Sequence, residues 1–194
     1  STGWINFQDV HVPAANMIGE EGEGFKVTMS AFDNGRYTVA AGATGLLRAS
    51  KEASVDYAKE RRSFGKPIAE HQLIQSKIAH MALDYEAARL LYLQAGWKKN
   101  QGQRNTFETS AAKWYATEKS FHAANEAIQV HGAYGYSDEY DVERYMRNAR
   151  GAVIYEGSNE IQQLIMASYA MGERRDKPLR CELPAYDSEA WQEE

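Results

Sequence analysis

The stretch most suggestive of chemistry places Glu156 between Tyr155 and Gly157, just ahead of a predicted helix. The aromatic ring would shield the carboxylate on one side, and glycine, which has no side chain, would let a ligand approach closely on the other. Ser158 or Asn159 can cap the helix, whose positive end stabilises a nearby anion. The alternative is a solvated acid in front of a helix, which is what most glutamates are.

A second suggestive residue is Arg36, which helical counting places on the apolar stripe of a long helix. A guanidinium on a buried face is costly unless an anion or hydrogen-bond acceptors meet it. Arg36 therefore either pairs with Asp33, three residues earlier, or lines a site. The sequence leaves both interpretations open.

A third suggestive stretch is the glycine-rich turn at residues 131–136. Such a turn at a helix end can present backbone N–H groups to phosphate, although most are only turns. It is not a Rossmann element, because no predicted strand precedes it and no βαβ unit surrounds it.

Helices are predicted to position all three stretches. The first begins at Gly24, runs for nearly ten turns and is closed by basic residues, Gly65 and Pro67. A second ends near residues 100–102, a third runs from about Thr106 to Gly132, and a short charged helix lies around residues 142–148. The apolar stripe expected on the first helix is Phe25, Met29, Phe32, Val39, Ala43, Leu46, Ala53 and Tyr57, and on the third Phe107, Trp114, Phe121 and Ile128. Long helices joined by short loops pack antiparallel, so the expected fold is all-α, an up-down four-helix-type bundle.

The two ends of the chain differ from this helical part. Residues 4–12 alternate as in a β-strand ended by Pro13, and one strand cannot form a sheet alone. Because the chain also begins without Met, we expect a piece of a longer polypeptide. In that interpretation residues 1–20 end an upstream β domain, residues 21–172 form the helical domain, and residues 173–194 form a polar tail.

Composition narrows the class of protein. With 194 residues, 43% hydrophobic and 25% charged, the chain is ordinary for a globular domain with a real core. A net charge of −5 argues against a nucleic acid partner. One cysteine and five histidines without metal-ligand spacing give no disulfide framework and predict no metal site. No apolar run is long enough to predict a membrane span.

Four separated segments resemble the acyl-CoA dehydrogenase family in order and spacing. They are residues 16–25, residues 60–68 with His71 and Gln72, residues 129–148, and residues 154–162. The resemblance covers residues 4–171 and corresponds to the family's C-terminal helical domain with the end of its middle β domain. It is strongest to the medium-chain members.

The resemblance implies an FAD enzyme that oxidises an acyl-CoA thioester to the trans-2-enoyl-CoA, a carboxylate taking the α proton while the β hydrogen leaves as hydride to flavin. Glu156 matches the catalytic base. Some members carry the base on the first long helix, where this chain has Gly35, so Glu156 has no competitor. Because the α proton is a weak acid, the base needs a dry pocket. The positions that match the lining of the acyl-thioester and pantetheine channel are Phe32, Asp33, Arg36, Tyr155 and Gly157.

The same resemblance implies an FAD site built from two segments. Positions matching the pyrophosphate and adenosine contacts are Arg61, Ser63, Phe64 and Gln72. The glycine-rich element, which approaches from a neighbouring subunit in the family, matches Gln129, Gly132 and Ala133, the last replacing a second glycine. Two further cofactor-binding positions are Ser158, where threonine is usual, and Glu160, a common variant.

The implied partners are an acyl-CoA substrate, an electron-transferring flavoprotein and further copies of the chain in a dimer or tetramer. The implied compartment is the cytoplasm of a bacterium or the mitochondrial matrix of a eukaryote. Two alternatives stay open. One is another flavin chemistry on the same scaffold, such as a monooxygenase or nitroalkane oxidase, and intact Glu156 and Arg36 argue against it. The other is a helical bundle that keeps the oligomer interface but has lost catalysis. Intact Glu156 and flavin positions argue against it, and the expected absence of the upstream domains keeps it open.

Overall fold

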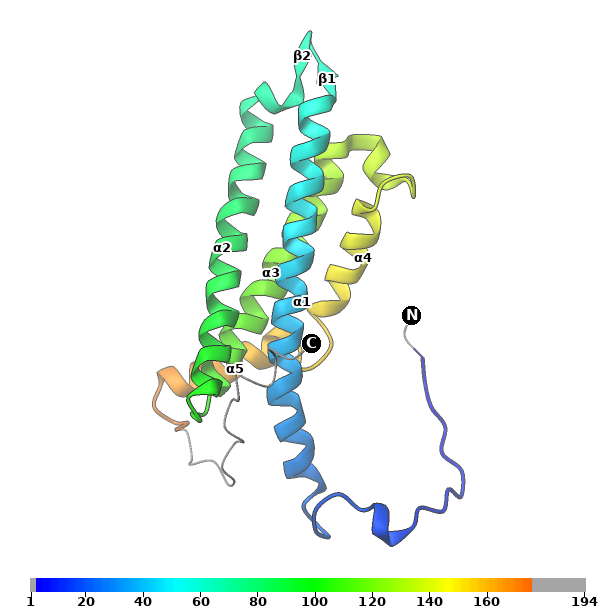
Figure 1. The fold of residues 1–194 in the computed structure, drawn as a ribbon, viewed down its shortest axis with the longest axis vertical. Coiled ribbons are helices and arrows are strands. Elements are labelled where there is room, and N and C mark those ends of the chain that lie inside the picture. The colour runs from blue at the N-terminus through cyan, green and yellow to red at the C-terminus, as the bar shows by residue number, and fades with distance from the viewer. Residues whose placement is uncertain (1–2, 176–194) are drawn as a thin grey trace, which may run out of the picture.

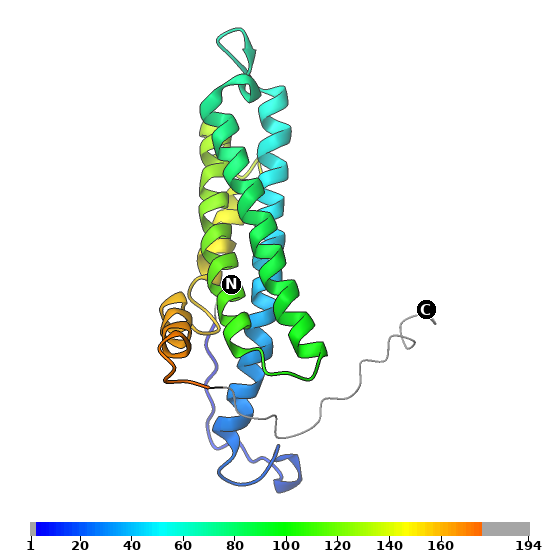
Figure 2. The same cartoon turned by 90° about the vertical axis from the view of Figure 1, so that its left-hand side faces the viewer.

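The computed structural model describes residues 3–175, and three long helices lying side by side form its body (Figure 1). They are α1 (Gly24–Glu60), α2 (Gln72–Asn100) and α3 (Thr106–His131), and α4 (Val142–Ala152) runs beside them as a shorter fourth helix. The chain direction alternates from each helix to the next (Figures 1 and 2). The predicted all-α, up-down four-helix arrangement is confirmed, and α1, with 37 residues, has the predicted length.

A small hairpin that the sequence did not reveal joins α1 to α2. Strands β1 (Arg62–Ser63) and β2 (Lys66–Pro67) pair antiparallel around Phe64 and Gly65, whose φ angles are 49° and 81°. Two consecutive left-handed residues suit the right-handed twist of a tight hairpin, and glycine takes this conformation without strain. A short 3-10 turn, η2 (Ile68–Glu70), then leads into α2.

The core between the helices is built mainly from alanine. Ala40 and Ala43 of α1 pack against Ala112 and Ala116 of α3, and Leu47 packs with Met81, Ala123, Ala127 and Val142. The apolar stripes predicted for α1 and α3 were therefore wrong in register, although Ala43 is buried as predicted. Phe25 is 75% exposed, and the other large residues of both stripes are half-buried or, like Phe32, exposed. Closely packed helices leave room at their contact only for small side chains, so the bulky residues flank it.

Polar pairs add to the contact between α2 and α3. Lys77 pairs with Glu126, and Lys98 Nζ lies 2.7 Å from Glu108 Oε1. The Tyr115 hydroxyl donates to Asp84 Oδ1 at 2.8 Å, and Lys119 lies 3.4 Å from the same oxygen.

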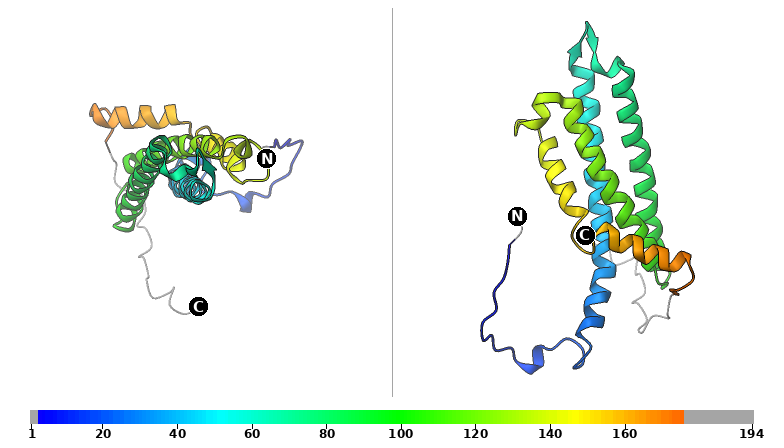
Figure 3. Two further views of the ribbon diagram at one scale, coloured as in Figure 1. Left: turned by 90° about the horizontal axis from the view of Figure 1, so that it is seen from above. Right: turned by 180° about the vertical axis from the view of Figure 1, so that it is seen from behind.

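The last helix, α5 (Asn159–Ala170), crosses the bundle instead of joining it lengthwise (Figure 3). A 3-10 turn, η3 (Gly132–Tyr136), connects α3 towards α4 at the hairpin end of the molecule, and the loop from α4 to α5 lies at the opposite end of α4 (Figure 1).

The N-terminal segment extends away from the bundle (Figure 1). The strand predicted over residues 4–12 is not formed, because no other segment of residues 3–175 pairs with it, and Trp4 is 86% exposed. A single 3-10 turn, η1 (Ala14–Asn16), precedes α1. Most of the predicted tail, residues 176–194, lies outside the described residues. Within residues 3–175, no helix combines the length and apolarity needed to cross a membrane.

Candidate active site

Glu156 lies in the loop between α4 and α5 with a left-handed backbone. Its φ is 54°, and that of Gly157 is 82°, so this loop turns sharply just before the last helix. Atom Oε2 of Glu156 is buried and has no hydrogen-bond partner among the described residues. The neighbouring Tyr155 ring is itself affected, because burial, and then the charge of Glu156, raise the pKa of its hydroxyl. The carboxylate is thus held in one place with an oxygen left free.

Gly35 of α1 provides the space that this carboxylate occupies. A Cβ atom on Gly35 would lie 2.9 Å from Glu156 Cδ and closer still to Oε2. The helix position that carries the base in other members of the resembled family and the loop position of Glu156 therefore point a carboxylate at the same spot. Only one of the two positions can hold a side chain here.

Arg36 lies beside the same loop and forms the predicted pair with Asp33. Its side chain, 10% exposed, donates to Asp33 Oδ1 at 3.3 Å, while its guanidinium carbon lies 6.0 Å from the Phe32 ring centroid. The Cβ position of Gly157 is 3.5 Å from Arg36 Nε and Nη2, and Nε has no hydrogen-bond partner among the described residues. The residues predicted to line the substrate channel thus come together from α1 and the loop.

Buried polar side chains that the sequence did not predict hold the loop by hydrogen bonds. Lys113 of α3, 0% exposed, donates to Asn159 Oδ1 at 3.0 Å and to the Val153 carbonyl at 3.4 Å. Gln162, also buried, donates from Nε2 to the Gly157 carbonyl at 3.0 Å. The sequence held a signal for the burial of Lys113, because it falls on a helical stripe of small residues of which every member is buried. The members of this stripe are Thr109, Lys113, Ala116, Ser120, Ala123 and Ala127.

The start of α5 corrects one expectation about capping. Ser158 occupies the N-cap position but makes no side-chain cap hydrogen bond, and Asn159 turns its side chain inward instead of capping. The Ser158 hydroxyl, followed by the Glu160 backbone N–H, lowers the pKa of the Glu160 carboxyl. Ser158 and Glu160 therefore belong to the Glu156 end of the molecule.

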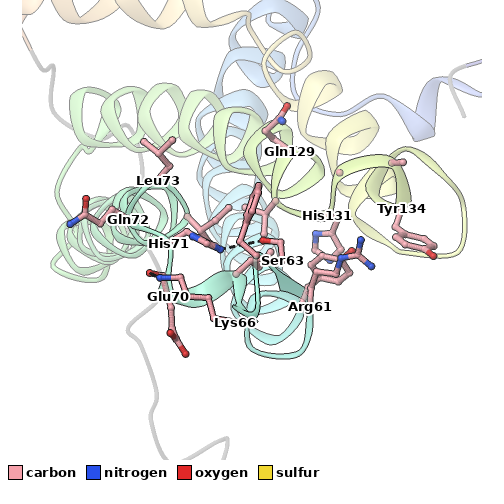
Figure 4. Close-up of a pocket in the computed structure, with 17 residues that line it drawn as sticks. Arg61, Ser63, Lys66, Glu70, His71, Gln72, Leu73, Gln129, His131 and Tyr134 are labelled. Carbon is pink, nitrogen blue, oxygen red and sulfur yellow. Dashed lines mark hydrogen bonds between the residues drawn. The ribbon is translucent and has the colours of Figure 1, made fainter.

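The other predicted cofactor positions gather around one open pocket of about 910 Å³ at the hairpin end (Figure 4). Arg61, His131 and Tyr134 lie at one end of this pocket, and His71, Gln72 and Leu73 lie at the other (Figure 4). The predicted residues that line it are Arg61, Ser63, Phe64, Gln72, Gln129, Gly132 and Ala133. The structure thus brings both predicted flavin-binding segments together within one chain, whereas Ser158 and Glu160 do not line this pocket.

The pocket wall combines a guanidinium, exposed aromatic rings and a buried imidazole. Arg61 lies 6.0 Å from the Tyr134 ring centroid and forms no ion pair within residues 3–175, and Phe64 is 96% exposed. His131 stacks on Tyr57 at 4.2 Å between ring centroids, and its Nδ1 lies 2.8 Å from the Ala127 carbonyl oxygen. Burial lowers the pKa of His131.

The glycine-rich turn of the pocket tolerates its alanine. Gly132, with φ 62° and ψ −138°, adopts a backbone that favours glycine. Ala133 lies in the following 3-10 turn, where an L-residue fits without strain. Gly135 is the position that needs a glycine, because a Cβ there would lie 2.7 Å from the Ile128 carbonyl oxygen.

Fold and geometry together define a helical domain with a carboxylate held at one end of α4 and an open, cationic and aromatic pocket at the other. Residues 22–171 match the family model described as "Acyl-CoA dehydrogenase, C-terminal domain". The chain belongs to the acyl-CoA dehydrogenase family.

Relatives and solved structures agree with this assignment. The short-chain specific acyl-CoA dehydrogenase of Megasphaera elsdenii is 46% identical over 159 residues, which are 82% of this chain and 42% of that protein. The structure of butyryl-CoA dehydrogenase from the same organism superposes with a TM-score of 0.83 at 45% identity, over 85% of this chain and 43% of that one. A structure described as the electron transferring flavoprotein of Acidaminococcus fermentans matches at TM-score 0.84 and 40% identity, over 88% and 44% of the two chains. The chain therefore spans less than half the length of the relatives that it matches.

Proposed function

We propose that this chain is the helical domain of an FAD-dependent acyl-CoA dehydrogenase in which Glu156 removes the α proton of the acyl-CoA thioester. The observation that carries the proposal is the Glu156 carboxylate, which lies against Gly35 with a buried oxygen that no group within residues 3–175 satisfies. A carboxylate saturated with hydrogen bonds is a weak base, whereas an unpartnered oxygen can accept a proton.

The residues around Glu156 suit this role. Tyr155 and Phe32 offer aromatic surface against which an acyl chain can pack, and Gly157 lets a thioester come close to the backbone. Arg36 supplies a buried positive charge near the loop, so a negative charge that develops on the substrate would be stabilised there. Exclusion of water by the bound substrate would strengthen these interactions.

The hairpin-end pocket fits FAD by its donor set. The guanidinium of Arg61, which forms no ion pair within residues 3–175, suits a pyrophosphate. The exposed Phe64 ring offers a stacking surface, and the backbone of Gly132 permits close approach. Ser63, Gln72, Gln129 and Ala133 complete the lining. These residues would hold FAD, which would supply the hydride acceptor of the reaction, and Glu156 would take the α proton.

Partners follow from the same proposal. We assign an electron-transferring flavoprotein as the electron acceptor, supported by the similarity to the Acidaminococcus structure. We also propose a homo-oligomer, because α2 leaves Leu83, Leu90, Leu93 and Trp97 exposed. An oligomer would allow the open pocket to receive FAD held by a neighbouring copy.

Glu156→Gln in the full-length protein tests the function. The amide cannot take the proton, so reduction of bound flavin by a saturated acyl-CoA should slow by more than about a hundredfold while flavin content stays unchanged. Glu143→Gln is the matched control, because Glu143 lies on the neighbouring helix α4 in an ion pair with Arg147. Retention of most of the reduction rate in Glu156→Gln would sink the assignment.

A further inference from the structure

Lys113 is a buried ammonium whose hydrogen bonds within residues 3–175 go to the Glu156 loop and to the helix that follows it. Its side chain is 0% exposed, and its two hydrogen-bond acceptors are the Val153 carbonyl and Asn159 Oδ1. No carboxylate within residues 3–175 lies close enough to form an ion pair with it. A lysine buried on neutral acceptors costs stability compared with an apolar residue, so packing alone does not account for it.

The two acceptors of Lys113 bracket the loop that turns through Glu156 and Gly157. The Asn159 backbone N–H donates to the Val153 carbonyl at 3.1 Å, which closes the loop on itself. The ammonium of Lys113 binds one acceptor on each side of this closure, and the Thr117 hydroxyl lies 2.9 Å from the same Asn159 oxygen. Lys113 therefore holds the loop at both ends and Thr117 contacts one of them, with the left-handed Glu156 lying between the two ends.

The charges facing Lys113 come from three elements. Arg36 on α1 repels the ammonium, while Glu160 on α5 and Glu156 on the loop attract it. Burial is the largest effect and, with Arg36, lowers the pKa of Lys113 to about 8. The ammonium is thus charged at neutral pH and loses its proton only in mildly alkaline solution.

We propose that Lys113 is the positioning residue of the base: its ammonium clamps Val153 and Asn159 and so holds the Glu156 carboxylate in its place against Gly35. This inference rests on the proposed function for its consequence in catalysis. The clamp itself is a property of the chain that is observable without substrate. Lys113 does not touch the thioester in this scheme and acts only through the loop.

The test compares Lys113→Met with Lys113→Arg in the full-length protein. Lys119→Met serves as the matched control, because it removes a cation from the same helix at a position that contacts Asp84 instead of the loop. Hydrogen exchange of the backbone amides of residues 155–159 is measured without acyl-CoA. Lys113→Met should speed exchange of the Asn159 amide about tenfold or more, since charge-assisted hydrogen bonds are lost. Lys119→Met should leave that exchange within about twofold of the wild type.

Flavin reduction by acyl-CoA supplies the second readout. Lys113→Met should lower the limiting reduction rate about tenfold to a hundredfold, with flavin content and acyl-CoA affinity within about twofold, because a base displaced by about 1 Å loses catalysis before binding. The arginine variant should recover part of the rate. The wild-type rate should fall as the pH rises through about 8, where Lys113 becomes neutral, and Lys113→Met should lack this step.

Each outcome decides the inference. Unchanged loop exchange in Lys113→Met overturns the clamp, and faster exchange with an unchanged reduction rate overturns its role in positioning the base. If Lys113→Met does not fold, Asn159→Ala, which removes the side-chain acceptor of the ammonium, should show the same changes in the same direction, and normal exchange there would refute the clamp. A wild type that reduces no flavin with any acyl-CoA, with Lys113→Met still loosening the loop, would refute the proposed function and leave the clamp standing.

Discussion

The two ends of α4 carry candidate sites of opposite character. At the loop end, Arg36 and Lys113 are buried, Glu156 is half-buried, and the loop that carries Glu156 accepts hydrogen bonds from α3 and α5. At the hairpin end, Arg61 and Phe64 project into an open pocket and are held by few contacts. The loop end is thus preorganised by the chain itself, whereas the hairpin end offers groups that a ligand must bring together.

This difference predicts how the two sites should respond to substitutions. A preorganised site fails when its geometry shifts by a fraction of an ångström, because its atoms have no freedom to adapt. An open site instead loses affinity roughly contact by contact. Substitutions at the two ends should therefore separate chemistry from cofactor retention.

The largest effect that would sharpen this contrast is expected from Gly35→Ala. The added methyl occupies the place of the Glu156 carboxylate, so the limiting rate of flavin reduction should fall about a hundredfold with unchanged flavin content. Gly45→Ala on the same helix is the control, because nothing lies within 4 Å of its Cβ position, and it should be neutral or slightly stabilising. Equal activity of the two variants would show that the carboxylate is not fixed against α1.

A smaller effect, confined to the other end, is expected from Arg61→Ala. Loss of a charge-assisted contact with a pyrophosphate should weaken FAD binding about tenfold to a hundredfold, measured by flavin fluorescence during dialysis. At saturating FAD the rate of reduction should be close to that of the wild type. Arg48→Ala, an exposed ion-paired residue of α1, controls for charge. Unchanged flavin content in Arg61→Ala would mean that Arg61 only stabilises the end of its helix.

The smallest expected effect is an acid response of the pocket wall. Burial lowers the pKa of His131 in the folded state, so below pH 6.5 the unfolded chain binds a proton that the folded chain resists. Stability is therefore lost as the pH falls from 6.5 towards the folded pKa. The melting temperature of His131→Phe, which keeps an aromatic ring against Tyr57, should drop less between pH 7.5 and 5.5 than that of the wild type. An identical drop in both proteins would exclude His131 as the source.

Helix limits could be predicted from the sequence, and buried faces could not. Gly24, Gly102 and Gly132 mark the helix ends correctly, because they break an apolar periodicity that is strong over many turns. The prediction that Phe25 and Phe32 lie on the buried face was wrong. Hydrophobicity favours large residues for the core, whereas a close contact between helices has room only for small ones.

The candidate site shows the same limit. Residue types singled out Glu156 and Arg36, and the resemblance to the family supplied the predicted flavin positions. The structure groups these residues into two clusters. The burial of Lys113 and Gln162 could not be predicted, because a charged or amide side chain is expected on the surface unless its buried hydrogen-bond partners are known. The left-handed backbone of Phe64 could not be predicted either, because the pairing of the hairpin imposes this conformation and phenylalanine itself does not favour it.

The alanine-built core has a consequence for the response of the bundle to ionic strength. Alanine loses no rotamer freedom on burial but removes little apolar surface from water, so each contact is inexpensive and weak. Helix α2 compensates with the partly exposed pairs of Lys77 with Glu126 and Lys98 with Glu108. Raising the salt concentration to about 1 M shortens the Debye length to about 3 Å, which screens these ion pairs. At high salt, α2 should therefore be the first of the long helices to lose its packing contacts, while α1 and α3, which meet through alanines, stay packed.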